Sequence, residues 1–213
     1  MIFQEIREHQ RERQERDEKR RQTLQEKIDT MEGIRDIVKI DQSVPDDDEA
    51  SIADISNGSL DKLLFEALDA HSQHHYSKAL RYYSFILNAK PEDQVCSIIS
   101  NHRGMVYFVQ SEYEKAIQDF TRAVQTNPRN YRAYYNRGHA YRMLKMYDRA
   151  LEDFDHAIEV DATQPQAYLG RAQVCCEIED YVQAVQNCHK ALNVEPKFEP
   201  AKRFLQVVKA KIF

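Results

Sequence analysis

Small apolar, large apolar and polar residues alternate with helical spacing from about residue 60 onward, and the arrangement recurs every 34 residues. One copy reads Gly104, Tyr107, Ala116, Phe120, Ala123 and Pro128. The next two read Gly138, Tyr141, Ala150, Phe154, Ala157 and Ala162, and then Ala172, Cys175, Ala184, Cys188, Ala191 and Pro196. A fixed period of this length indicates one supersecondary unit copied several times.

Each copy is predicted to be two helices joined by a turn. Small residues such as Gly104 and Ala116 suit the point where the two helices cross and their backbones approach closely. Large residues such as Tyr107 and Phe120 fill the space where the helices diverge. Pro128 ends the second helix because it lacks an N–H group and clashes with the preceding turn. We expect almost complete burial of the small residues at the crossings: Gly104, Ala116, Gly138, Ala150, Ala172 and Ala184.

One helix pair cannot bury both of its faces alone, so neighbouring pairs must stack into an all-α solenoid. A weaker copy of the pattern lies 37 residues before the first clear one, at Ala67, Ala70, Tyr76, Ala79, Tyr83, Ile86 and Pro91. The extra residues, Gln94 to Cys96, are expected to lengthen the start of a helix. The predicted repeats span about 60–93, 97–130, 131–164 and 165–198.

The small–Tyr–Ala–Phe–Ala–Pro pattern resembles the tetratricopeptide repeat, most clearly from Asn136 to Tyr141 and from Ala150 to Phe154. The resemblance covers about 60–198 and implies a protein-interaction module without catalytic activity, acting as an adaptor or scaffold. The last repeat departs from the pattern at Cys175 and Cys188, where aromatic residues are usual. These thiols predict a smaller core in the same fold.

The resemblance also implies that the first helix of each repeat lines a concave groove in which partner segments lie. Arg132, His139 and Arg142 would make the middle of this groove mildly basic, so an extended acidic and apolar segment is the expected partner. The candidate binding residues are Asn101, Met105, Phe108, Arg132, Tyr135, Asn136, His139, Arg142, Gln166 and Gln173, with Leu64, Leu68 and Leu169 as further lining.

Two other interpretations stay open. The chain could be a structural subunit of a larger intracellular assembly, with its repeats buried against neighbours. It could also be a co-chaperone-like adaptor, although only Asn136 matches the Lys, Asn, Asn, Lys and Arg set that clamps a terminal carboxylate in that class. Asn101, Met105, Gln166 and Gly170 occupy the other four places, and without the cations a carboxylate loses its charge-assisted hydrogen bonds.

Arginines recur every 34 residues at Arg103, Arg137 and Arg171, which would suit a ladder of phosphate contacts. Asp119 and Asp153 recur sixteen residues after the first two arginines, where the second helix returns beside the first. Ion pairs inside each repeat are therefore the favoured interpretation.

No catalytic, metal or cofactor site is predicted. His71, His74 and His75 fall at the expected turn of the first repeat, and neither a carboxylate nor a thiol follows at ligand spacing. Cys175 and Cys188 replace core aromatics, which favours buried, unreactive thiols. The sequence shows no nucleophile–base pair and no Gly-rich phosphate loop.

The rest of the chain divides into three segments. Residues 1–40 form a charged helical extension with ten basic and ten acidic side chains, and residues 41–59 form an acidic linker. The extension has a partial apolar stripe, so it could self-associate in a short coiled coil, dock on the repeats or meet a partner helix. Residues 199–213 are expected to cap the solenoid, with Phe204, Val207, Val208 and Ile212 on one helical face.

The charge and hydropathy of the chain argue against a nucleic-acid partner and against a membrane span. Residues 63–213 carry nineteen basic and eighteen acidic side chains, and this near-neutral balance gives no footprint for nucleic acid. No run of about 18 apolar residues predicts a membrane span. The first residues turn polar at once, as expected of a cytoplasmic protein without a signal peptide.

Overall fold

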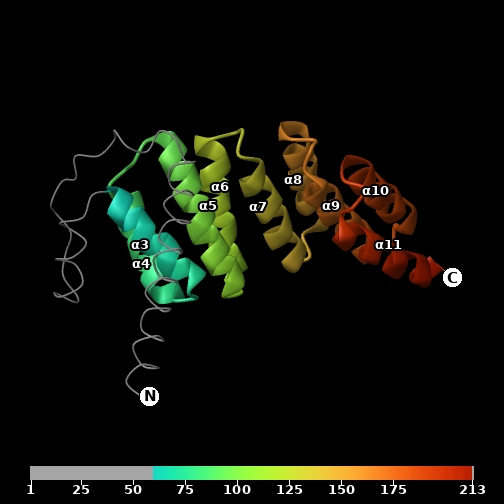
Figure 1. Cartoon of the computed structure of the whole chain (residues 1–213), viewed down its shortest axis with the longest axis horizontal. Coiled ribbons are helices and arrows are strands. Elements are labelled where there is room, and N and C mark those ends of the chain that lie inside the picture. The colour runs from blue at the N-terminus through green and yellow to red at the C-terminus, as the bar shows by residue number, and fades with distance from the viewer. Residues whose placement is uncertain (1–59, 213) are drawn as a thin grey trace, which may run out of the picture. The chain divides into compact units, whose positions relative to one another are not determined.

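The structure is a computed structural model that describes residues 60–212 (Figure 1). The predicted extension at 1–40 and linker at 41–59 lie outside the described residues. Within residues 60–212 every regular element is an α-helix, and no strand is present. The all-α solenoid prediction is confirmed.

The chain divides into two compact units with a boundary after Pro91. The described part of the first unit contains α3 (Leu60–Ser72) and α4 (Tyr76–Asn88). The second unit contains three helix pairs and a final helix: α5 (Asp93–Val109) with α6 (Tyr113–Thr126), α7 (Tyr131–Met143) with α8 (Tyr147–Val160), α9 (Pro165–Glu177) with α10 (Tyr181–Val194), and α11 (Glu199–Ile212).

The described part of the first unit is one helix pair. Its side chains Leu64, Ala67, Ala79 and Tyr83 are fully buried. His71 packs against the ring of Tyr83, with Nδ1 3.3 Å from the tyrosine hydroxyl. Over residues 60–212 no three His, Cys, Asp or Glu side chains lie close enough together to hold a metal ion.

In the second unit each helix packs against its pair mate, and the second helix of a pair packs against the first helix of the next (Figure 1). The small residues at the helix crossings are buried, as predicted: Gly104, Ala116, Gly138, Ala150, Ala172 and Ala184. At Gly104 an added Cβ would lie 2.7 Å from the ring of Phe120, so the approach of α5 to α6 requires glycine.

The extra residues before Ser97 lengthen the start of helix α5, as the sequence predicts. Helix α5 has 17 residues, whereas α7 and α9 have 13 each, and the extra turn runs from Asp93 to Cys96. Val95 in this turn is buried, so the extension contributes to the core.

The turns between pairs are held by polar side chains as well as by proline. Asn127 accepts the Arg129 N–H at 3.0 Å, and Asp161 accepts the Thr163 N–H at 3.0 Å. These side chains mimic a backbone turn two residues on. The turn after α8 therefore keeps its form with Ala162 in the place of proline.

The last pair has thiols in its core, and α11 completes it. Cys175 and Cys176 pack in one cluster with Val208, and Phe204 of α11 lies against it. Cys188 is also buried, and its burial raises the pKa of its thiol to about 11, with a smaller contribution from Cys176. Burial also raises the pKa of the Cys175 thiol, so both predicted thiols are buried and protonated at neutral pH.

The predicted apolar face of α11 is wrong at Val207, whereas Ile212 lies on the face of Ala201 and Val208 but is exposed at the end of the helix. Val207 and Ile212 are 51% and 46% exposed, whereas Ala201 and Val208 are buried. Ala201, Phe204 and Val208 follow the i, i+3, i+7 spacing of one helix face, and Val207 is turned away from it by about 100°.

Candidate functional site

The first helices of the three pairs, α5, α7 and α9, lie side by side in the second unit and carry two cavities. The α5–α7 cavity, of about 360 Å³, is lined by Met105, Phe108, Val109, Phe120, Tyr135, Asn136, His139 and Arg142. The second cavity, of about 330 Å³, is lined by Asn101, His102, Met105, Tyr131, Arg132, Tyr135, Asn136 and Gln166. The two cavities adjoin, because Met105, Tyr135 and Asn136 line both.

Of the ten candidate binding residues, all except Gln173 line at least one of these cavities, whereas the further residues Leu64, Leu68 and Leu169 line neither. Gln173 lies on α9 with its Oε1 buried and without a hydrogen-bond partner among the described residues. Four further residues line the cavities and are not among the predicted ones: His102, Val109, Phe120 and Tyr131. Phe120, which the sequence predicts as a packing residue, is fully buried beneath the α5–α7 cavity.

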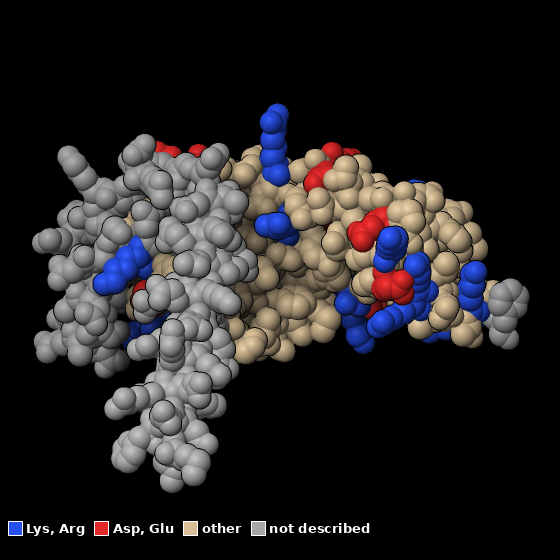
Figure 2. Space-filling view, in the orientation of Figure 1, with Lys and Arg blue, Asp and Glu red and all other residues tan. Residues whose placement is uncertain are grey.

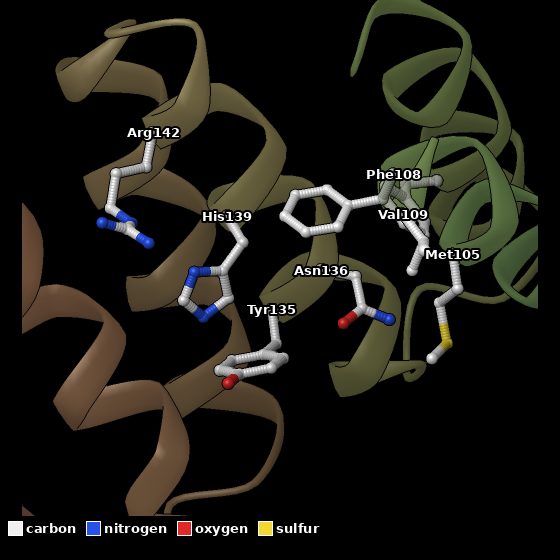
Figure 3. A pocket seen from close by; sticks show the side chains of 8 residues that line it. Met105, Phe108, Val109, Tyr135, Asn136, His139 and Arg142 are labelled. Atoms are coloured by element: carbon white, nitrogen blue, oxygen red, sulfur yellow. The ribbon is translucent and has the colours of Figure 1, made fainter. Parts of the chain in front are cut away.

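The α5–α7 cavity is lined by side chains of α5 and α7 (Figure 3), with Phe120 of α6 beneath them. Met105, Phe108 and Val109 project from α5, and Phe108 points toward His139 on α7. A band of apolar atoms thus faces a band of aromatic and polar side chains, which is the usual composition of a recognition cavity.

Phe154 of α8 supports the α7 wall from within. Its ring centroid lies 5.0 Å from that of His139 and 6.0 Å from that of Tyr135, both edge to face. An added Cβ at Gly138 would be 3.1 Å from this ring, and one at Gly170 only 2.5 Å. Phe154 therefore fits between two glycines and fixes the height of the two rings above it.

The charge expected in the middle of the groove is largely neutralised. Nη1 of Arg142 donates a hydrogen bond to the Glu177 carboxylate at the end of α9. The Nε of Arg142 is buried and has no acceptor among the described residues. Arg132 is exposed beside the ring of Tyr131, so the basic character of the groove is concentrated there.

The titratable rings of the α5–α7 cavity are neutral. Burial, and then the charge of Arg142, lower the pKa of His139 to about 4. Burial raises the pKa of Tyr135. At neutral pH the cavity therefore presents an uncharged imidazole and an uncharged phenol.

Asn136, the one residue that matches a carboxylate clamp, is engaged within the protein. Its Nδ2 donates to Oδ1 of Asn101 at 2.9 Å, which links α7 to α5. The Nδ2 of Asn101 in turn lies 3.9 Å from the sulfur of Met105. These neutral contacts hold the floor of the groove and leave no cation at the clamp positions.

The recurring arginines bind aspartates inside the repeats, as predicted for the first two. Arg103 forms two hydrogen bonds to Asp119, at 2.7 and 2.6 Å, and Arg137 forms two to Asp153, at 2.8 and 2.7 Å. Arg171 lies 2.7 Å from Asp155 of the preceding repeat. These contacts support the ion-pair interpretation over a phosphate ladder.

The charged side chains elsewhere in the second unit are distributed differently (Figure 2). The face over α7 is mostly uncharged and hollowed in this view, whereas side chains of both signs gather over α11. Lys202 and Glu199 of α11 pair with each other at 2.8 Å. No helix in the described part of the chain is long and apolar enough to cross a membrane.

Two family models match the chain in this region. The tetratricopeptide repeat model matches residues 131–163, and a second model, described as TPR repeat, matches residues 104–145. Together with the helix pairs described above, these matches identify residues 104–163 as tetratricopeptide repeats. No curated protein sequence matches it significantly.

Solved structures share the fold. YrrB, described as a TPR protein with an unusual peptide-binding site, superposes with a TM-score of 0.63 at 20% identity, over 75% of this chain and 79% of that one. The first TPR domain of Spaghetti (RPAP3), bound to an HSP90 peptide, gives 0.54 at 24% identity, over 57% and 96%. The second TPR domain of human RPAP3, in complex with an HSP70 peptide, gives 0.50 at 26% identity, over 55% and 95%.

Proposed function

We propose that α5, α7 and α9 bind an extended segment of a partner protein and that the chain acts as a non-catalytic adaptor or scaffold. The observation that carries this proposal is the pair of adjoining cavities lined by Met105, Tyr135 and Asn136. The 34-residue packing pattern does not require these side chains. Concave surfaces with aromatic and polar groups are typical of recognition sites.

The partner segment is proposed to carry apolar side chains and to lie across both cavities. The sequence predicts that the partner segment carries acidic side chains as well. Arg132 supports this expectation, because its exposed charge in the second cavity could pair with such a side chain. Arg142 supports an acidic partner segment less, because it already forms an ion pair with Glu177. The peptides bound to the TPR domains of Spaghetti and human RPAP3 make a peptide ligand a reasonable class for this groove as well.

Tyr135 and Arg142 are the side chains to remove. Tyrosine and arginine are frequent anchors of interfaces, because each combines a large contact area with a polar end. Tyr135→Ala combined with Arg142→Ala should abolish capture of the partner from native lysate. The matched control is Tyr147→Ala with Arg149→Ala, which removes the same residue types from α8, outside both cavities.

Circular dichroism must show that both double variants keep their helix content. Loss of capture by the Tyr135 and Arg142 variant alone supports the groove as the binding surface. Undiminished capture by that folded variant would contradict the proposal and direct attention to surfaces outside α5, α7 and α9.

A further inference from the structure

We infer that the α5–α7 cavity receives one uncharged apolar side chain of the partner segment, and that Glu177 keeps acidic side chains out of it. This inference rests on the proposed function, since it specifies the chemistry that the same groove selects.

The shape and lining of the cavity favour a single apolar anchor. Met105, Phe108, Val109 and Phe120 supply apolar walls, and the volume of about 360 Å³ is at the lower end of the range for sites that hold small ligands. A long aliphatic or aromatic side chain fits this size and removes its own apolar surface from water.

The polar wall cannot compensate a carboxylate. The rings of Tyr135 and His139 lie 4.6 Å apart, edge to face, and both are neutral at physiological pH. Asn136 already donates to Asn101. A carboxylate moved into this cavity would lose its hydration without gaining a counter-ion there, which is strongly unfavourable.

Arg142 is the one charged residue in the lining of the α5–α7 cavity, and Glu177 already occupies it. Because Glu177 is held beside Arg142 by the fold, it competes at high effective concentration with any acidic group of a partner. The side chain of Arg142 is 21% exposed, so the bond is sheltered but still open to exchange.

The buried Nε of Arg142 provides an independent indication of the ligand. This N–H has no acceptor among the described residues, and a buried donor without a partner is unfavourable. A backbone carbonyl of the bound segment could accept this hydrogen bond while Nη1 stays with Glu177. The site is therefore suited to a neutral acceptor beside an apolar side chain.

The test is selection from a random peptide library displayed on phage, with the full chain as bait. The baits are the wild-type protein, Glu177→Gln and the matched control Glu179→Gln, which removes an equal charge two residues away without removing the partner of Arg142. Wild type and the control should enrich peptides that share an uncharged apolar position. Glu177→Gln should admit peptides with Asp or Glu at that position.

Fluorescence polarisation then measures one enriched peptide and its counterpart with Glu at the anchor. Wild type should bind the Glu peptide at least about tenfold more weakly, as expected when a charge enters an apolar cavity. Glu177→Gln should bind the Glu peptide about two- to fivefold more tightly than wild type does, the range expected for a partly exposed ion pair. Glu179→Gln should behave as wild type.

The outcomes separate the inference from the proposed function. Enriched peptides with an acidic anchor in wild type, or a Glu177→Gln variant with wild-type preference, would overturn the inference and leave groove binding intact. A library that yields no peptide whose binding depends on Tyr135 would overturn the proposed function and this inference with it.

Discussion

The α7–α8 pair and the α9–α10 pair have the same helix lengths, 13 and 14 residues, but different interiors. Phe154 fills the core of the first pair, and Cys188 stands at the matching position of the second. The second pair keeps the fold because Phe204 and Val208 of α11 pack against it. Core residues can thus be exchanged when a neighbouring helix supplies apolar packing.

The two pairs also differ in what they offer a partner. Tyr135, Asn136, His139 and Arg142 on α7 correspond, 34 residues later, to Leu169, Gly170, Gln173 and Cys176 on α9. The α9 set is smaller and carries no charge. Recognition in this account is therefore concentrated on α7, and α9 contributes mainly Glu177 and Gln166.

The largest loss of stability is expected when Phe154, in the core of the α7–α8 pair, is replaced by cysteine, the residue at the matching position of the α9–α10 pair. Phe154→Cys should lower the free energy of unfolding by about 3–5 kcal/mol, as in other deletions of buried aromatic rings. Urea denaturation measures this loss. The reference variant is Cys188→Ala, which removes one sulfur atom and should have a clearly smaller effect. Equal losses would contradict the view that the two cores are filled differently.

The buried imidazole on α7 predicts a pH dependence that α9, with Gln173 in its place, cannot have. His139 has a pKa of about 4 in the folded protein, whereas an unfolded histidine titrates near 6.5. Between these values the unfolded chain binds a proton that the folded chain does not. The contribution of His139 to the free energy of unfolding is therefore fully present above pH 6.5. It falls by roughly 3 kcal/mol as the pH is lowered to 4.

The contribution of His139 is isolated by comparing variants. His139→Gln should flatten this part of the stability curve relative to wild type, whereas the exposed control His189→Gln should not. The measurement is urea denaturation at pH 7.5, 6, 5 and 4. Identical pH profiles for wild type and His139→Gln would show that the imidazole is solvated in the folded state.

Substitution of Gly138 tests how closely α7 and α8 cross beneath the groove. Gly138→Leu should lower the free energy of unfolding by more than about 2 kcal/mol, because even its Cβ would lie 3.1 Å from Phe154 and 3.3 Å from the Ala150 carbonyl oxygen. Gly138→Ala places only the Cβ there and should be much milder. A melting curve of Gly138→Leu that matches wild type would refute the close crossing of α7 and α8.

The smallest effect concerns the turns inside the pairs. Ser111, Lys145 and Glu179 occupy equivalent positions and all have positive φ, between 58° and 64°. Glycine adopts this conformation without the steric penalty that other residues incur. Lys145→Gly should therefore raise the free energy of unfolding by about 0.5–1 kcal/mol, measured by urea denaturation, with Lys190→Gly in α10 as a control that should destabilise.

The sequence predicted the features that recur. The 34-residue period located the helix pairs, the small residues at their crossings, and the pairing of Arg103 with Asp119 and of Arg137 with Asp153. It also placed on one side of α7 most of the α7 residues that line the two cavities, since residues three, four and seven positions apart share a helix side.

Features without a repeat were missed. Arg142 pairs with Glu177, but the positions 34 residues earlier are Phe108 and Met143, so this ion pair does not recur and no periodic signal revealed it. The left-handed turn residues are a serine, a lysine and a glutamate rather than glycine, which hides their conformation. Gly170 is required by the ring of Phe154 from the preceding pair, a contact between repeats that composition alone does not indicate.

The most direct test of the central claim is site-specific photo-crosslinking in native lysate. A photoreactive amino acid replaces Met105, which lines both cavities, or Glu152, which is exposed on α8 outside them. If the partner lies in the groove of α5, α7 and α9, it should form an adduct through position 105 and not through position 152. An adduct through position 152 alone, from a folded protein, would contradict binding in the groove of α5, α7 and α9.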